Sequence, residues 1–81
     1  MKAKLLVVDD EKDICKVLEF LLKSEGYSVT VACNGEEALE KLKKERFDLV
    51  ITDLKMGKVD GLAVLEKTKE LSADTAVVIM T

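Results

Sequence analysis

The chain has 81 residues, of which 48% are hydrophobic and 36% are charged, and its formal net charge is -3. This length is enough for one small domain, and the composition is typical of a globular protein with an apolar interior. The 13 basic residues are interleaved with 16 acidic ones, so we expect no direct nucleic-acid binding by this segment. No apolar run approaches the roughly 20 residues of a membrane span and no secretory signal pattern is recognisable, so we expect no membrane contact and a cytoplasmic location.

Short apolar runs alternate with helical patterns along the sequence. The first run, Leu5–Val8, has the length of a strand and the continuous hydrophobicity that is typical of a strand buried on both faces. Asp10 is then in a position to cap a helix, and Gly26 is in a position to end it. The residues that recur at helical spacing and predict one buried face of this helix are Ile14, Val17, Leu18, Leu21 and Leu22.

A second strand and helix follow. The segment Ser28–Ala32 contains three consecutive β-branched residues and predicts a strand. Asn34, followed three residues later by Glu37, predicts the start of a helix. The apolar face expected for this helix is formed by Ala38, Leu39 and Leu42.

Two more apolar runs and one more helix complete the pattern. The run Leu49–Thr52 predicts a third buried strand that ends at Asp53, and Val77–Met80 predicts a fourth. Between them the sequence predicts a loop to Asp60 and a helix from Gly61 to Leu71. The residues expected to face inward on this helix are Leu62, Leu65 and Thr68. Strands alternating with helices predict an α/β fold with a doubly wound parallel sheet and right-handed crossovers.

Three aspartates come directly after predicted strands. Asp9 and Asp10 follow the first strand, and Asp53 follows the third. Ligands of parallel α/β sheets bind beyond the carboxyl ends of the strands, so the three carboxylates converge if these strands are neighbours. Close anions repel one another and need a cation, and oxygen donors without histidine favour a hard divalent ion such as Mg²⁺. Each aspartate alone could be a helix cap or a turn residue, so the prediction depends on their combination.

The chain has two cysteines, Cys15 and Cys33, and no histidine. Their spacing fits neither a zinc site nor a redox motif. We therefore expect both to be ordinary small side chains that are buried or half-buried in the fold.

Four segments stand in a distinctive order and spacing along the whole chain: Leu6–Glu11, Asp48–Met56, the pair Asp60-Gly61, and Val77–Thr81. Together they resemble the receiver domain of bacterial response regulators in two-component signalling systems. The resemblance implies a flavodoxin-like receiver fold with the strand order 2-1-3-4-5. It also implies that residues 1–81 are one receiver domain that is truncated after its fourth strand. The last helix, strand and helix would be missing, together with a lysine that pairs with the phosphoryl group.

The resemblance assigns a role to each candidate site residue. Asp53 would accept a phosphoryl group from a phosphohistidine on a sensor histidine kinase, forming a labile acyl phosphate. Asp10 and Asp53 would bind Mg²⁺ directly, Asp9 would lie close by and act through water, and the backbone carbonyl of Lys55 would be a further ligand. Thr81 would be a switch hydroxyl that turns toward the phosphoryl group. The chain would then be a signalling switch for an output domain outside this sequence, in transcription regulation, and not an enzyme.

Departures from the family pattern leave other functions open. The loop after Asp53 contains Gly57 where the family usually has proline, so the sequence predicts a more flexible loop than is usual in the family. The fourth strand would be an exposed apolar edge, which invites pairing with another chain. One alternative is therefore a receiver fragment that is not phosphorylated and forms a homo-oligomer through this edge. A magnesium-dependent phosphatase would need an acid where Lys55 stands, and a flavin protein would need a phosphate-binding loop after the first strand.

Overall fold

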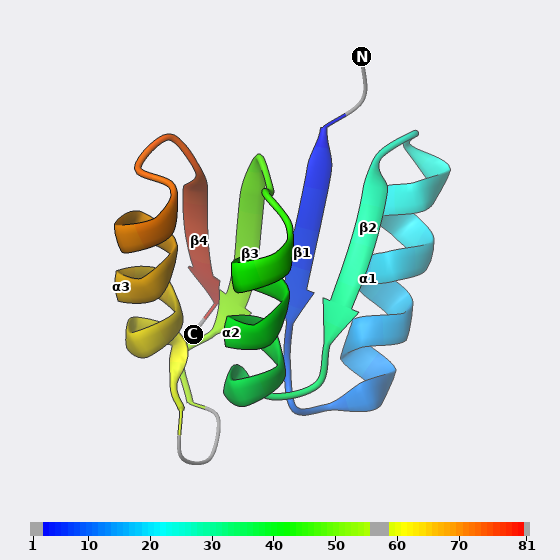
Figure 1. Ribbon diagram of the computed structural model, residues 1–81. Helices are drawn as coiled ribbons and strands as arrows, with labels where there is room; N and C mark the ends of the chain where they lie inside the picture. Colours follow the sequence, from blue (N-terminus) through cyan, green and yellow to red (C-terminus); the bar gives the residue numbers. More distant parts are fainter. Residues whose placement is uncertain (1–2, 56–58, 81) are drawn as a thin grey trace.

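The computed structural model describes residues 3–55 and 59–80, in which strands and helices alternate (Figure 1). The elements are β1 Lys4–Val8, α1 Lys12–Ser24, β2 Ser28–Ala32, α2 Gly35–Lys44, β3 Leu49–Asp53, α3 Gly61–Leu71 and β4 Ala76–Met80. Every predicted strand is present, with bounds that differ from the prediction by no more than one residue at either end. Among the helices of the described residues, none combines the length and the hydrophobicity that crossing a membrane requires.

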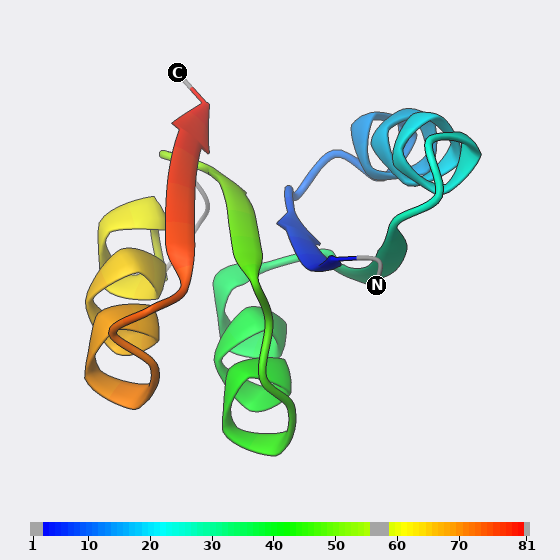
Figure 2. The same ribbon diagram turned by 90° about the horizontal axis from the view of Figure 1, so that it is seen from above.

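The four strands form one parallel sheet in the order β2-β1-β3-β4. Helix α1 lies on one face of the sheet, over β1 and β2, whereas α2 and α3 lie on the opposite face (Figure 2). This arrangement confirms the predicted doubly wound layout. It also makes β1 and β3 direct neighbours, with Val8 beside Thr52, so that the carboxyl ends of the two strands lie side by side.

The main core lies between the sheet and helices α2 and α3. Its buried members are Leu6, Val8, Ala32, Ala38, Leu42, Phe47, Val50 and Val64. The alternate residues Leu5 and Val7 point to the other face, where they are buried as well. Strand β1 is therefore covered on both faces, which explains its continuous apolar sequence. Each fully buried aliphatic side chain stabilises the fold by about 1.5–3 kcal/mol relative to exposure.

Helix α2 begins as the sequence predicts. The side chain of Asn34 accepts a hydrogen bond from the backbone N–H of Glu37, with a distance of 2.7 Å between the two atoms. Its predicted apolar face is also confirmed, because Ala38 and Leu42 are buried and Leu39 packs against the core. This cap anchors the helix at the same edge of the sheet where the three aspartates lie.

Helix α1 ends as predicted but does not begin as predicted. Its N-cap residue is Glu11, whose side chain makes no capping hydrogen bond, so the prediction that Asp10 is the cap was wrong. At the other end Gly26 has a φ angle of 96°, and its N–H donates to the carbonyl of Lys23 at 3.0 Å. Glycine adopts this left-handed conformation without strain, which is the usual way to end a helix.

Helix α1 buries less apolar surface than its sequence pattern predicts. Leu18 and Leu22 are half-buried, but Ile14, Val17 and Leu21 are 40%, 55% and 52% exposed. These last three form what we call the α1 flank. On a right-handed helix that runs antiparallel to the strands, this flank faces the half of the sheet formed by β3 and β4. On the face of the sheet that α1 covers, Figure 2 shows no helix of the described residues over β3 and β4, so the flank has no packing partner there.

Helix α3 has the predicted bounds but is rotated relative to the predicted inward face. The buried positions are Gly61, Val64 and Thr68, whereas Leu65 is half-buried and Leu62 is 51% exposed. The inward assignment of Leu62 was therefore wrong. The rotation is set at the start of the helix, where Gly61 packs directly on the backbone of β3. Residues three and seven positions later then face the core with it.

Candidate functional site

The carboxyl ends of β1 and β3 carry the three aspartates that the sequence singled out. One carboxylate oxygen from each of Asp9, Asp10 and Asp53 can be chosen so that all three lie within 4.8 Å of one another. Asp9 is buried, Asp53 is half-buried and Asp10 is exposed, so the cluster opens to solvent on one side. The structure thus brings together residues that are separated by more than 40 positions in the sequence.

Asp9 is the most constrained of the three side chains, with only 5% of its surface exposed. Its Oδ1 atom accepts a hydrogen bond from the backbone N–H of Glu11 at 2.9 Å. Burial raises the pKa of the Asp9 carboxyl, the hydrogen bond from Glu11 opposes this shift, and the charges of Asp53 and Asp10 raise the pKa further. The protein therefore holds a carboxylate where its negative charge is unfavourable.

Asp53 is the last residue of β3, and its side chain lies at the start of the following loop. The backbone N–H of Lys55 lies 3.4 Å from its Oδ1 atom, and the Thr52 hydroxyl donates to its carbonyl oxygen at 3.1 Å. Lys55 is thus beside Asp53, as the sequence pattern requires, while the role of the Lys55 carbonyl as a metal ligand stays a prediction. Thr81, the predicted switch residue, lies outside the described residues.

The pair Asp60-Gly61 begins helix α3 in contact with the backbone of Asp53. Asp60 caps α3, because its Oδ1 atom accepts a hydrogen bond from the N–H of Ala63 at 3.0 Å. A Cβ atom on Gly61 would overlap the carbonyl oxygen of Asp53 and would lie 2.9 Å from the Cα atom of Leu54. Glycine therefore allows α3 to start in direct contact with the backbone that carries Asp53. The sequence showed this pair as part of the family pattern but gave no role for it.

The cluster is electrostatically suited to a small divalent cation. Two unit charges 4.8 Å apart repel by roughly 3–4 kcal/mol at an effective dielectric constant of about 20. The donors are all oxygen atoms and the site is partly open, which fits an ion such as Mg²⁺ that takes one or two carboxylates and keeps several waters. The residues present therefore fit the predicted metal.

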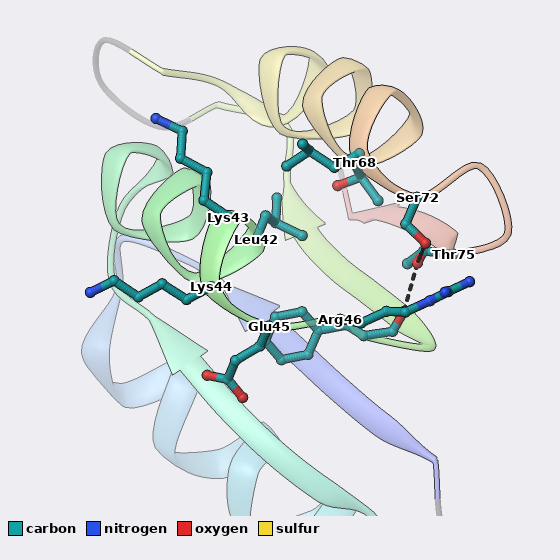
Figure 3. A pocket seen from close by; sticks show the side chains of 10 residues that line it. Leu42, Lys43, Lys44, Glu45, Arg46, Thr68, Ser72 and Thr75 are labelled. Atoms are coloured by element: carbon teal, nitrogen blue, oxygen red, sulfur yellow. Dashed lines mark hydrogen bonds between the residues drawn. The ribbon is translucent and has the colours of Figure 1, made fainter.

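A surface hollow lies far from these aspartates, at the opposite end of the sheet, between the last turns of α2 and α3 (Figure 3). Its lining includes Arg46, Thr68, Ser72 and Thr75. The hydroxyl of Thr75 donates to the carbonyl of Phe47 at 2.6 Å and lies 2.8 Å from the hydroxyl of Ser72. Thr68 donates to a backbone carbonyl of its own helix. Because these hydroxyls already have partners, we assign no ligand to this hollow.

Comparisons of the sequence with known proteins agree with this geometry. Residues 5–81 match the model of the response regulator receiver domain. The transcriptional regulatory protein ZraR of Escherichia coli (strain K12) is 43% identical over 77 residues, which are 95% of this chain and 18% of that protein. The transcriptional regulatory protein DltR of Streptococcus agalactiae serotype III (strain NEM316) is 38% identical over 78 residues, 96% of this chain and 35% of that protein. The chain thus spans only a minor part of either relative.

Comparisons with solved structures show the same fold. A CheY-like response regulator receiver domain protein from Methanospirillum hungatei JF-1 superposes with a TM-score of 0.93 at 30% identity, over 98% of this chain and 63% of that one. The chemotaxis protein CheY4 of Vibrio cholerae superposes with a TM-score of 0.90 at 33% identity, over 98% of this chain and 68% of that one. From its sequence, its strand order and its cluster of aspartates, this chain belongs to the response regulator receiver domain family.

Proposed function

We propose that this chain is a phospho-accepting receiver module in which Asp53 takes a phosphoryl group from a phosphohistidine of a sensor histidine kinase. The observation that carries this proposal is the convergence of Asp9, Asp10 and Asp53 at the carboxyl ends of two adjacent strands. Phosphoryl transfer depends mainly on positioning and on charge neutralisation, and this cluster provides a nucleophile together with a cation site.

Asp53 is the nucleophile in this proposal. An oxygen of its carboxylate forms a bond to phosphorus as the bond between phosphorus and the histidine nitrogen breaks. The N–H of Lys55, 3.4 Å from Oδ1, and the packing of Gly61 on the backbone of Asp53 orient the carboxylate. Since Asp53 is half-buried at the open side of the cluster, a donor can approach it from solvent.

The cation site is formed by Asp9 and Asp10 together with Asp53. A bound Mg²⁺ ion supplies positive charge that offsets the negative charge of the transferred phosphoryl group. The N–H of Glu11 orients the carboxylate of Asp9, and the exposed carboxylate of Asp10 is accessible from solvent. The Lys55 carbonyl completes the proposed ligand set.

Signalling to an output domain is the remaining part of the proposal. The chain would act as a cytoplasmic switch and not as an enzyme, with Thr81 reporting the phosphorylation state of Asp53. The relatives ZraR and DltR carry the name transcriptional regulatory protein, which supports an output in transcription regulation. The backbone N–H of Leu54 donates to the carbonyl of Met80 at 3.1 Å, so the end of β4 already contacts the loop after Asp53.

The test is intact mass spectrometry after incubation with acetyl phosphate, with and without Mg²⁺. We expect the wild-type chain to gain one phosphoryl group only with Mg²⁺, and Asp53→Asn to gain none. The matched control is Asp74→Asn, because Asp74 is exposed, lies outside the cluster and pairs only with Arg46 among the described residues, at 3.4 Å. A chain that is folded by circular dichroism and gains no phosphoryl group would refute the proposal.

A second candidate function is self-association without phosphorylation. Strand β4 lies at an edge of the sheet, and its residue Val78 is 48% exposed. Unpaired strand edges with apolar side chains favour pairing with another chain. Sedimentation velocity over a range of protein concentrations tests this candidate. A monomer at every concentration would exclude it, whereas a dimer that dissociates when Val78 is changed to Lys would support it.

A further inference from the structure

The β1–α1 turn carries two of the three clustered aspartates, and a buried thiol lies against it. Cys15 is in the first turns of α1 and is 3% exposed, which makes it the most deeply buried side chain of that helix. Its Sγ atom lies 3.2 Å from the carbonyl oxygen of Asp9 and 3.9 Å from that of Ala32. The carbonyl of Ala32 also accepts the N–H of Asp9 at 3.2 Å. The thiol therefore sits where β1, β2 and α1 meet.

The hydrogen bond to the Asp9 carbonyl has a consequence for the next residue. This carbonyl and the N–H of Asp10 belong to the same planar peptide unit. A donor that fixes the direction of the carbonyl also fixes the position of the Asp10 Cα atom, from which the Asp10 side chain extends. Asp10 is exposed, so side-chain packing contributes little to its placement. The backbone before Asp10 therefore takes a larger part in placing its carboxylate.

The two aspartates of this turn are held in different ways. The carboxylate of Asp9 is oriented directly, by the N–H of Glu11 at 2.9 Å. For Asp10, the thiol of Cys15 donates to the carbonyl of the peptide unit that precedes it, at 3.2 Å. A thiol suits this position because it is apolar enough to be buried and still donates a weak hydrogen bond.

We propose that Cys15 is a positioning residue that sets the orientation of the Asp9–Asp10 peptide and, through it, the place of the Asp10 carboxylate in the cation site. This inference rests on the proposed function for its effect on Mg²⁺, but the orientation of the peptide is a property of the metal-free chain. Removing the donor leaves the carbonyl of Asp9 without this partner and allows the turn to relax.

The experiment compares the wild-type chain with three variants. Cys15→Ala removes the donor, Cys15→Ser restores one, and Cys33→Ala is the matched control because Cys33 is the other cysteine and makes no contact with Asp9 among the described hydrogen bonds. Binding of Mg²⁺ is measured by calorimetry at a temperature where circular dichroism shows every variant to be folded. We expect Cys15→Ala to bind Mg²⁺ about three- to tenfold more weakly, and Cys15→Ser to bind within about twofold of wild type. Cys33→Ala should bind as wild type does.

A metal-free measurement separates this inference from the proposed function. The amide ¹⁵N and ¹H chemical shifts of Asp10 should move in Cys15→Ala, and should stay near the wild-type values in Cys15→Ser and Cys33→Ala. If the folded Cys15→Ala chain keeps the Asp10 shifts, or if Cys15→Ser behaves like Cys15→Ala in both measurements, the inference is wrong. If the wild-type chain itself binds no Mg²⁺, the proposed function is refuted, and the metal-free shifts alone decide the role of Cys15.

Discussion

The substitution Asp9→Asn should make the metal-free protein more stable. The charge of Asp9 is buried and has two other carboxylates within 4.8 Å, each of which repels it by roughly 3–4 kcal/mol at an effective dielectric constant of about 20. Solvent and salt screen the exposed Asp10 strongly and the half-buried Asp53 in part, so the net gain should be nearer 2 kcal/mol. Asparagine keeps an oxygen that can accept the N–H of Glu11, so the substitution removes the charge and preserves the hydrogen bond.

The pH dependence of this gain follows from the direction of the pKa shift. The pKa of Asp9 is raised above its ordinary value of 3.8, mainly because the carboxyl is buried. The contribution of the Asp9 carboxyl to stability is therefore fully present below pH 3.8, and this contribution is lost as the pH rises through the folded-state pKa. Wild type and Asp9→Asn should have similar stabilities in acid, and the advantage of the variant should grow as the pH rises toward neutrality.

Thermal unfolding followed by circular dichroism, with a chelator and at low salt, measures this difference. For a chain of this size a gain of about 2 kcal/mol raises the unfolding midpoint by roughly 10 °C. Adding Mg²⁺ should stabilise wild type more than the variant, because the variant has lost a charged donor near the cation. Asp74→Asn, at an exposed site, should change neither result. If Asp9→Asn unfolds at or below the wild-type midpoint at neutral pH without metal, the repulsion assigned to the cluster is wrong.

Three further predictions concern other parts of the fold. Gly61→Ala should destabilise the chain by about 1–3 kcal/mol in urea unfolding and lower the phosphorylation rate, because the added Cβ atom would overlap the carbonyl of Asp53. An unchanged stability and an unchanged phosphorylation rate would contradict the close packing. Cys33 should react with Ellman's reagent in the native chain, whereas Cys15 should react only after unfolding. The reason is that burial raises the pKa of the Cys15 thiol to about 11. Equal reaction rates of the two thiols in the native chain would contradict this prediction. Asn34→Ala should cost about 1 kcal/mol in urea unfolding, whereas Asn34→Asp should cost much less, and equal losses would argue against the cap.

The sequence predicted the strands and the aspartate cluster because both depend on simple patterns. Continuous apolar runs identify buried parallel strands, and residues directly after such strands gather at one edge of the sheet. The convergence of Asp9, Asp10 and Asp53 follows from this pattern without knowledge of any side-chain contact.

What the sequence could not predict depends on how the elements pack. The rotation of α3 is set by the contact of Gly61 with β3, so helical spacing alone placed Leu62 inward and missed Val64. The hydrogen bond from Cys15 to the Asp9 carbonyl joins residues whose contact follows only from the path of the turn. Asp10 was expected to be a cap, but the chain passes one residue further before α1 begins.

The α1 flank changes how substitutions at its positions are tolerated. In the chain by itself, polar residues at Ile14, Val17 and Leu21 should cost little, because these side chains already lie in water. The half-buried neighbours Leu18 and Leu22 should be far more sensitive. A mutational scan of these five positions, repeated within a longer protein that contains this domain, would compare two patterns of tolerance. Some flank positions would tolerate a polar residue in the first scan but not in the second. At each of these positions, a neighbouring segment of the longer protein packs on α1.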